Sequence, residues 1–393
     1  MFSIKISELV KNGEVIIKTG PFGTQLKASE YVKMGTPVLN VKNLGYGRVV
    51  DEKLDMVGND TVERLSAHLL RTGDIVFGRK GAVERHAFIS QNEKGWMQGS
   101  DCIRLRVNSS RINPKYLSYY FLTDKHKAFM MGMCSHGTTM ASLNQKIIEQ
   151  IEVPLPSIDV QNKIVALLGC IDEKVKINEK INDNLLAQAQ TLYKQFFPYG
   201  VQDDLPDGWR IGTVGEIIEI HDSKRIPLSG ADRTKMEKKI YPYYGAASLM
   251  DFVDNYIFDG KYLLLGEDGT VVDDAGYPIL QYVWGQFWVN NHAHILTGRL
   301  GYDVESLYML FKQTPVKSIV TGAVQPKISQ ANLRSVQVVI PPEHNLREYN
   351  DLVEPLFSLF RANEEECKTF TALRDMLLPK LMSGEIDVSA VQL

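Results

Sequence analysis

The chain has 393 residues, a formal net charge of −3, 44% hydrophobic residues and 23% charged residues. This is ordinary usage for a folded protein, so the composition excludes an intrinsically disordered or collagen-like chain, and the length predicts two to four compact units at roughly 100 to 200 residues each. The four cysteines form no CxxC pair, the first residues do not form a signal peptide, and no apolar run reaches the roughly 18 residues of a membrane span. We therefore expect a cytoplasmic protein without disulfides, a Cys-based zinc site or a membrane segment.

The charge is unevenly distributed along the chain. Residues 1–157 hold 21 Lys and Arg against 15 Asp and Glu, whereas residues 209–342 hold 13 against 14. The remaining stretches, 158–208 and 343–393, together hold 10 against 18. One basic segment is thus masked by acidic ones, and the net charge of the whole chain does not exclude a nucleic-acid partner.

The sequence contains a long-range internal repeat. A shift of 185 residues places Gln145 on Gln330 and Val153 on Val338, and it then holds without a gap through the next fifty residues. Upstream of residue 137 the offset between the two copies varies from about 187 to 208. In this region residues 73–78 correspond to residues 260–266. The repeat predicts two halves that share one scaffold and differ in their loops.

Residues 1–157 open the first half with short apolar or alternating runs, such as 75–77 and 102–107. Residues 199–342 open the second half in the same way, with runs at 262–265 and 294–297. Gly, Pro, Asn and Asp punctuate these runs, which predicts two β-rich globular units with a few helices each.

Residues 158–198 and 343–393 close the two halves, and apolar residues recur in both at spacings of four and three. This pattern predicts two long helices that pair as a coiled coil. We expect the pair to be antiparallel, so that Ile164 lies near Leu381 while Phe196 lies near Tyr349. The pattern places the following residues on the two seams: Ile164, Leu168, Ile171, Val175, Leu185, Ala189, Leu192 and Phe196, then Tyr349, Val353, Leu356, Phe360, Cys367, Phe370, Leu377 and Leu381.

Three features qualify the helices. Asn178 and Asn363 occupy matched positions, where they either fix the register by hydrogen bonding to each other or face solvent at a break in the seam. Pro355 has no proline counterpart in the first half and predicts a kink or a late start of the second helix. Gly384 looks like its termination signal.

A search for catalytic motifs finds none that is complete. Residues 113–116 spell Asn-Pro-Lys-Tyr, close to a methyltransferase loop, but no glycine-rich cofactor loop precedes them, and an N-cap followed by proline explains them better. His292 and His294 lack the helical spacing of a zinc pair, and the sequence has neither a phosphate-binding loop nor a nucleophile elbow. Residues 267–268 and 273–274 are acidic and suggest a metal-dependent nuclease, but a solvated hairpin loop is the better interpretation. We predict no catalytic residue and no metal ligand.

The loops of the two β-rich units carry basic, polar and aromatic residues that suit contacts with phosphates and base edges. Among them, Arg79 and Lys80 stand between two glycines, where a turn would present them to phosphates. In the first half the candidates are Lys18, Gly20, Phe22, Gly23, Thr24, Lys27, Lys42, Asn43, Arg79, Lys80, Gln98, Ser100, His136 and Thr138. In the second half they are His221, Ser223, Lys224, Arg225, Tyr244, Asn290, Asn291, His292, Gln325 and Lys327.

These residues, in this duplicated order, resemble the specificity subunit of type I restriction-modification systems over nearly the whole chain. The paired arrangement carries the resemblance rather than any single motif. The matching strings of the first half are Gly20-Pro21-Phe22-Gly23 with Lys27 and Glu30-Tyr31, Gly73-Asp74-Ile75-Val76, Gly137-Thr138 leading to Gln145, and Val153-Pro154-Leu155-Pro156. Those of the second half are residues 322–325, Ile328-Ser329, Ile340-Pro341-Pro342, residues 373–378 and Gly384.

The resemblance implies an α+β fold of two pseudo-symmetric halves. It implies target recognition domains at 1–157 and, with a linker, at 199–342, a spacer helix at 158–198, and a second helix with a tail at 343–393. It also implies a bipartite duplex DNA target, with half-sites held apart by the helices. A helix of about 35 residues is roughly 50 Å long, comparable with the roughly 35 Å of one turn of B-DNA.

The resemblance further implies that separate partner subunits carry out methylation and cleavage. Two methyltransferase subunits would dock through the helices and adjoining surfaces and would bind S-adenosylmethionine, and restriction subunits would complete the assembly. The chain itself would bind no cofactor. The alternatives are a specificity subunit of a related fused or type IIB-like system, a metal-dependent nuclease, and a duplicated scaffold whose loops bind protein.

Overall fold

The computed structural model describes residues 3–134, 141–322 and 324–391. They form two compact units. Unit 1 comprises Met1–Lys176 and Glu366–Leu393, and unit 2 comprises Ile177–Glu365. Both boundaries fall inside the two long helices, so each unit combines one β-rich domain with a segment of each helix.

Unit 1 is centred on a four-stranded sheet in the order β2–β9–β6–β7, whose strands pair antiparallel. Ile103 and Leu105 of β9 face the core with Phe77 and Tyr119, because side chains alternate between the faces of a strand. The strands of this unit are β1 (Ser3–Lys5), β2 (Val15–Thr19), β3 (Tyr31–Val32), β4 (Thr36–Leu39), β5 (Asp55–Val57), β6 (Ile75–Gly78), β7 (His86–Phe88), β8 (Met97–Gln98), β9 (Cys102–Val107) and β10 (Glu152–Pro154).

A second sheet in unit 1 has the order β3–β5–β4–β8, and β1 pairs with β10. The side-chain oxygen of Asn113 accepts hydrogen bonds from the N–H groups of Lys115 and Tyr116, which confirms the predicted N-cap with Pro114 as the first helical residue. The short helices are α1 (Ile6–Lys11), α2 (Asn59–Arg64), α3 (Pro114–Tyr120), α4 (Asp124–Cys134) and α5 (Gln145–Glu149), with 3-10 turns at Ala28–Glu30, Val41–Asn43 and Ser66–His68.

Unit 2 repeats this plan. Its central sheet has the order β12–β19–β16–β17, its second sheet the order β14–β13–β18–β15, and β11 pairs with β20. The strands are β11 (Arg210–Thr213), β12 (Ile218–Ile220), β13 (Tyr241–Tyr244), β14 (Leu249–Val253), β15 (Phe258–Asp259), β16 (Tyr262–Gly266), β17 (Leu280–Val283), β18 (Gln286–Val289), β19 (Ala293–Gly298) and β20 (Gln337–Ile340). The helices are α7 (Val214–Ile217), α8 (Gly230–Thr234), α9 (Val304–Phe311) and α10 (Gln330–Arg334), with 3-10 turns at Asp222–Lys224 and Lys317–Ile319.

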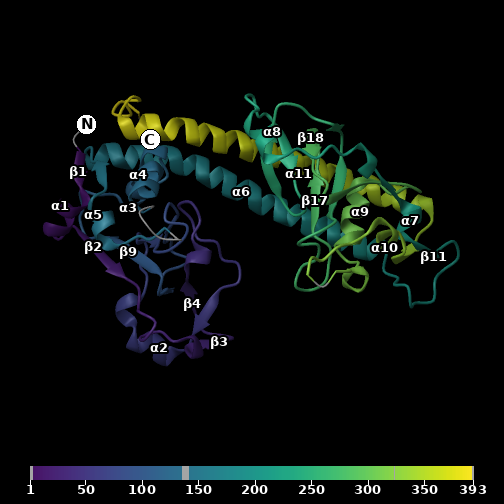
Figure 1. Ribbon diagram of the computed structural model, residues 1–393, viewed down its shortest axis with the longest axis horizontal. Coiled ribbons are helices and arrows are strands. Elements are labelled where there is room, and N and C mark those ends of the chain that lie inside the picture. The colour runs from purple at the N-terminus through teal and green to yellow at the C-terminus, as the bar shows by residue number, and fades with distance from the viewer. Residues whose placement is uncertain (1–2, 135–140, 323, 392–393) are drawn as a thin grey trace. The chain divides into compact units, whose positions relative to one another are not determined.

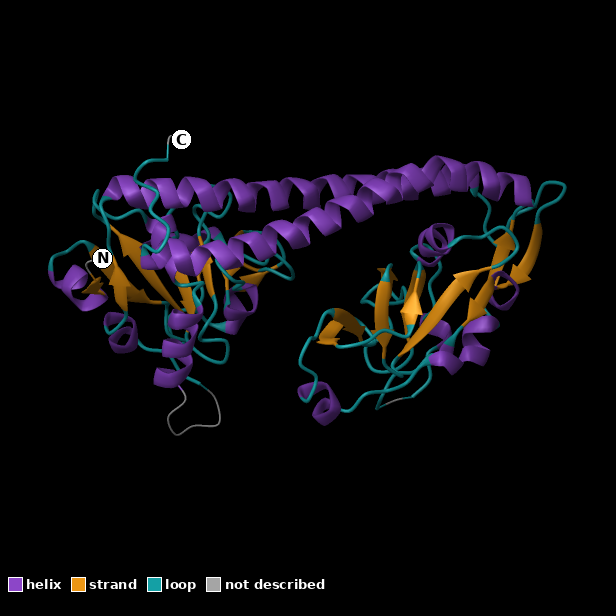
Figure 2. Ribbon diagram, turned by 90° about the horizontal axis from the view of Figure 1, so that it is seen from above, coloured by secondary structure: helices purple, strands orange, loops and turns teal. Residues whose placement is uncertain are grey.

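The central sheets of the two units therefore share one strand order, as the repeat predicts, whereas in the second sheets β3 lies beside β5 in unit 1 and β15 lies beside β18 in unit 2. Each has a parallel strand pair in its second sheet, β4 with β8 in unit 1 and β13 with β18 in unit 2. In each, the strands gather into sheets beside the long helices (Figures 1 and 2). The α+β class with two related halves is confirmed.

The long helices are α6 (Ile158–Phe196) and α11 (Glu343–Ser383), and they pair antiparallel. In unit 1, Ile164 near the start of α6 and Leu381 near the end of α11 are buried in the same core. In unit 2, Phe196 at the end of α6 packs against Tyr349 near the start of α11, with ring centroids 5.9 Å apart. Both predicted neighbours are confirmed. No helix among the described residues is long and apolar enough to cross a membrane.

Asparagines of the helix seam are buried rather than solvated. Asn178 and Asn363 are 2% and 8% exposed. The Asn363 amide donates to Asn182 Oδ1 at 2.9 Å, and the Asn182 amide donates to the Phe360 carbonyl at 3.3 Å. The solvent-facing alternative is therefore wrong, and a polar contact across the seam sets the register of the helices within unit 2.

Of the two outcomes predicted for Pro355, the late helix start is wrong, because α11 is helical from Glu343 through this residue to Ser383. Pro355 is exposed, whereas Val353 and Phe357 on either side are buried in the core of unit 2. The packing of these neighbours outweighs the one backbone hydrogen bond that proline removes. The helix ends at Gly384, whose φ is +78°, as the sequence predicts.

Candidate nucleic-acid interface

The loops with predicted DNA contacts converge at one edge of unit 1. Thr19 at the end of β2 pairs with Ile103 of β9, and Gly78 at the end of β6 pairs with Cys102. The parallel strands β4 and β8 end together at the pair Leu39 and Gln98. The loops 20–27, 40–43, 79–81 and 99–101 therefore leave from the same strand ends, and we call them the loop edge of unit 1.

Two glycines allow these loops to approach closely. A Cβ atom added to Gly20 would lie 1.9 Å from the carbonyl oxygen of Gly99, and one added to Gly99 would lie 2.4 Å from Oδ1 of Asn40. Any larger residue would push the loops apart.

Unit 2 has an equivalent loop edge. The loops 221–225, 245–248, 267–269 and 290–292 follow or precede the matching strand ends, where Gly266 of β16 pairs with Ala293 of β19. Residues 324–327 join them, because the Gly269 N–H donates to the Pro326 carbonyl.

Most of the candidates of unit 1 are accessible. Phe22 is 57% exposed, and the Arg79 guanidinium lies 5.8 Å from the centre of its ring. Lys42 is exposed and forms an ion pair with Asp55 at 2.9 Å. Gly23, Thr24, Lys27 and Lys80 are also exposed, and Ser100 is half-buried.

Other candidates of unit 1 have structural roles instead. The amides of Asn43 and Gln98 are fully buried and donate to backbone carbonyls, Asn43 to Val50 and Glu52 and Gln98 to Lys18 and Cys102. The Lys18 ammonium donates to the Ala67 carbonyl, and Gly20 is buried. These contacts support the loops. His136 and Thr138 lie outside the described residues.

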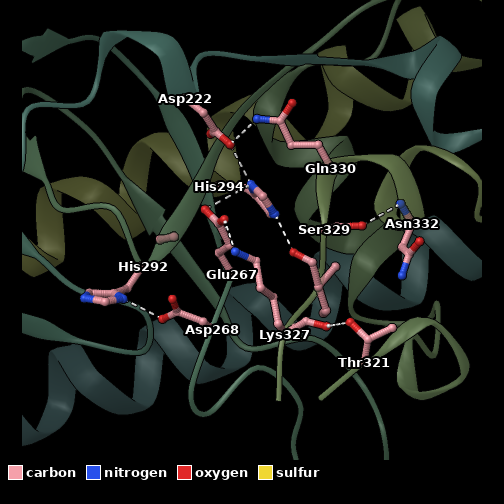
Figure 3. Close-up of polar contacts among 12 residues, drawn as sticks. Asp222, Glu267, Asp268, His292, His294, Thr321, Lys327, Ser329, Gln330 and Asn332 are labelled. Carbon is pink, nitrogen blue, oxygen red and sulfur yellow. Dashed lines mark hydrogen bonds and ion pairs between the residues drawn. The ribbon is translucent and has the colours of Figure 1, made fainter. Parts of the chain in front are cut away.

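An ionic network lies beneath the loop edge of unit 2 (Figure 3). Arg225 contacts Glu267 at 2.7 Å and Asp222 at 3.4 Å, and Lys327 contacts Glu267 at 3.2 Å. The buried His294 lies between the Asp222 carboxylate, 2.6 Å from Nδ1, and the Ile328 carbonyl, 2.8 Å from Nε2. Burial by itself would raise the pKa values of the Asp222 and Glu267 carboxyls. The neighbouring His294 and Arg225 nevertheless hold the pKa of each below its ordinary value.

This network also bears on the nuclease alternative. Asp222, Glu267 and His294 place potential metal-ligand atoms within 4.8 Å of one another, but Arg225 and Lys327 already supply the positive charge there. Asp268 instead pairs with His292, and Asp273 accepts the N–H groups of Ala275 and Tyr277 in a turn. The suspected acidic residues therefore do not form one centre. The interpretation of Glu267 as part of a solvated loop is wrong, since its side chain is 13% exposed.

The remaining candidates of unit 2 divide in the same way. His221 bonds to Thr297, Tyr244 packs against Phe287, and Asn290 is 4% exposed, so these residues, like Arg225, have contacts within the unit. Ser223, Lys224, Asn291, Gln325 and Lys327 are exposed, and His292 is half-exposed.

One glutamine in each unit donates a hydrogen bond to a residue at its loop edge. The two glutamines were not among the predicted site residues. Gln145 donates to Thr19 at 3.0 Å in unit 1, and Gln330 donates to Asp222 at 2.6 Å in unit 2. They are equivalent under the shift of 185 residues, which was the signal that could have identified them.

The family model for the type I restriction modification DNA specificity domain matches residues 5–187 and 206–366. The chain belongs to the type I DNA specificity family. Each of the two matched segments contains one loop edge, so the family domain is present twice, as the internal repeat requires.

Known members of the type I DNA specificity family resemble the chain over most of its length. The type I restriction enzyme MjaIX specificity subunit of Methanocaldococcus jannaschii is 22% identical over 83% of this chain and 81% of its own length. The EcoprrI specificity subunit of Escherichia coli is 22% identical over 75% of this chain and 73% of its own. The S subunit structure from M. genitalium has a TM-score of 0.55 at 16% identity, covering 97% of this chain and 96% of that chain, which shows a shared fold.

Proposed function

We propose that this chain reads a bipartite sequence in duplex DNA, with one part bound by the loop edge of each unit. The observation that carries the proposal is the convergence of the same loops at the same strand ends in both units, with different exposed side chains on each. A constant scaffold with variable loops is what a protein needs to recognise two different half-sites.

In this proposal, partner subunits carry out the methylation and cleavage of DNA. Two methyltransferase subunits bind through α6, α11 and adjoining surfaces and carry S-adenosylmethionine, and restriction subunits join the full complex. This chain binds no cofactor or metal and acts in the cytoplasm by positioning those subunits on DNA. Support comes from the relatives, which are named as subunits of restriction enzymes, and from the duplication, which offers two equivalent docking surfaces.

Methylome sequencing tests the proposal. Cells that express the chain with its methyltransferase subunits should gain methylation at one bipartite motif, and cells that lack the chain should not. In mobility-shift assays the assembled complex should bind that motif less tightly as salt rises, because protein cations displace counterions from the phosphates. Methylation that is unchanged without the chain, or binding that does not respond to salt, would contradict the proposal.

A further inference from the structure

The two loop edges share a backbone frame that goes beyond general topology. The Arg79 N–H donates to the Asp101 carbonyl at 2.8 Å in unit 1, and the Glu267 N–H donates to the His292 carbonyl at 2.8 Å in unit 2. The carbonyls of Arg79 and Glu267 each accept the N–H of a residue in the next loop, Leu143 and Ile328, again at 2.8 Å. The frame therefore makes Lys80 equivalent to Asp268.

The next glycine completes the frame. Gly81 and Gly269 have φ angles of +77° and +83°, and each donates its N–H across to the adjoining loop. On the other strand, Asp101 precedes Cys102 as His292 precedes Ala293, and Cys102 and Ala293 are the equivalent partners of Gly78 and Gly266. Asp101 and His292 are therefore equivalent as well.

The carboxylate takes opposite places on this frame in the two units. In unit 1, Lys80 lies 3.9 Å from Asp101. In unit 2, Asp268 lies 2.5 Å from Nδ1 of His292, whose other ring nitrogen is directed away from the carboxylate (Figure 3). Unit 1 thus has a lysine after β6 and a carboxylate before β9, whereas unit 2 has a carboxylate after β16 and an imidazole before β19.

Stability does not explain the exposed members of these pairs. The side chains of Lys80, Asp101 and His292 are 56%, 51% and 44% exposed, whereas that of Asp268 is 20% exposed. Exposed ion pairs contribute little to folding. A carboxylate does, however, accept a hydrogen bond from the amino group of cytosine in the major groove, where base pairs differ in the order of their donors and acceptors.

We propose that Lys80 with Asp101 and His292 with Asp268 are base-reading pairs, which contact base edges in the major groove with the carboxylate in opposite positions in the two units. The inference rests on the proposed function and names the residues that set its specificity. It also separates Arg79 from Lys80: Arg79, placed over Phe22, contacts phosphate, and Lys80 contacts a base.

Exchanging the members of each pair tests the inference, because the exchange keeps the same two side chains and moves the carboxylate to the other position of the pair. The variants are Lys80→Asp with Asp101→Lys, and Asp268→His with His292→Asp. Each is assembled with methyltransferase subunits and selects DNA from a pool randomised at both half-sites. We expect each variant to change the preferred base at one or two adjacent positions of its own half-site, by about tenfold to a hundredfold, which corresponds to one good base contact.

The matched control exchanges an ion pair at the opposite end of β2, Glu14→Arg with Arg111→Glu, and should select the original sequence. Thermal unfolding of each variant checks its fold, and Lys80→Gln and Asp268→Asn replace an exchange that does not fold; these should weaken discrimination at the same positions. Selection of the original base at every position would overturn the inference, and so would loss of preference across both half-sites. If the unaltered complex selects no sequence, the proposed function itself fails.

Discussion

Two buried histidines in unit 1 are neutral in the folded protein. His86 and His126 are 0% and 2% exposed, and burial lowers the pKa of each to about 3. Neither ring nitrogen of His126 has a hydrogen-bond partner among the described residues, and its ring packs 4.7 Å from that of Phe121. The unfolded chain would bind protons at both positions near pH 6.5, whereas the folded chain would not.

Stability should therefore fall as the pH drops below about 6.5, because protons then bind the unfolded state preferentially. At pH 5 the loss is about 2 kcal/mol for each histidine. Urea unfolding at pH 7 and pH 5 measures it. Between pH 7 and pH 5, the free energy of unfolding of His126→Phe should fall by about half as much as that of the unaltered chain. For His344→Gln, at an exposed position, it should fall by the full amount. Equal losses in all three proteins would show that His126 does not contribute.

Arg79 should contribute to affinity without contributing to sequence preference. We expect Arg79→Gln to weaken binding of the assembled complex to all sequences alike and to reduce the slope of log affinity against log salt by about 1. Binding titrations at several salt concentrations measure the slope. Lys11→Gln, at an exposed position on α1, is the control and should leave the slope unchanged. An unaltered slope in Arg79→Gln would show that this guanidinium faces away from DNA.

Among the elements, α11 is attached to the sheet of unit 2 through a buried charge. Glu305 on α9 is fully buried and accepts the Tyr282 hydroxyl at 2.7 Å. Lys261 lies 2.7 Å from this carboxylate, and Arg361 of α11 lies 3.1 Å from it. A buried carboxylate that loses one of its cations is left partly uncompensated.

We expect Arg361→Met to lower the free energy of unfolding by roughly 2 kcal/mol, since Lys261 still neutralises part of the charge. Denaturant unfolding measures the change. The double variant with Glu305→Gln should lose less than the sum of the two single variants, because no buried charge then remains. Arg347→Met removes an exposed pair with Glu343 on the same helix and should change stability by less than about 0.5 kcal/mol. A similar loss in Arg347→Met and Arg361→Met would contradict the role of Glu305.

For the whole molecule we expect recognition without catalysis. The purified chain should neither transfer a methyl group from labelled S-adenosylmethionine to DNA nor cut DNA in the presence of divalent metal, because the sequence has no cofactor loop and Arg225 and Lys327 occupy the acidic network of unit 2. Both assays use highly purified protein, with the assembled complex as the positive control. Turnover that persists through further purification would refute this expectation.

Much of the architecture follows from the sequence alone. The repeat predicts two related halves, the spacing of apolar residues predicts two long helices, and Asn113 and Gly384 mark helix ends, because these signals depend on residues close together in the chain. The antiparallel pairing was predicted from the family resemblance, because two identical partner subunits need two equivalent docking surfaces, which a pseudo-twofold relation of the halves supplies. The late helix start predicted at Pro355 is wrong because the packing of Val353 and Phe357 overrides a local preference.

Only the tertiary structure decided which polar loop residues are exposed. Gln98 bonds to the Lys18 carbonyl 80 residues away, and Arg225 bonds to Glu267 42 residues away, so no local pattern distinguishes them from free loop residues. The reversed pairs, Lys80 with Asp101 and Asp268 with His292, likewise become equivalent only through strand register, because the sequence shift between the halves varies in this region. Local composition determines elements, whereas burial and charge pairing depend on contacts between distant residues that folding alone creates.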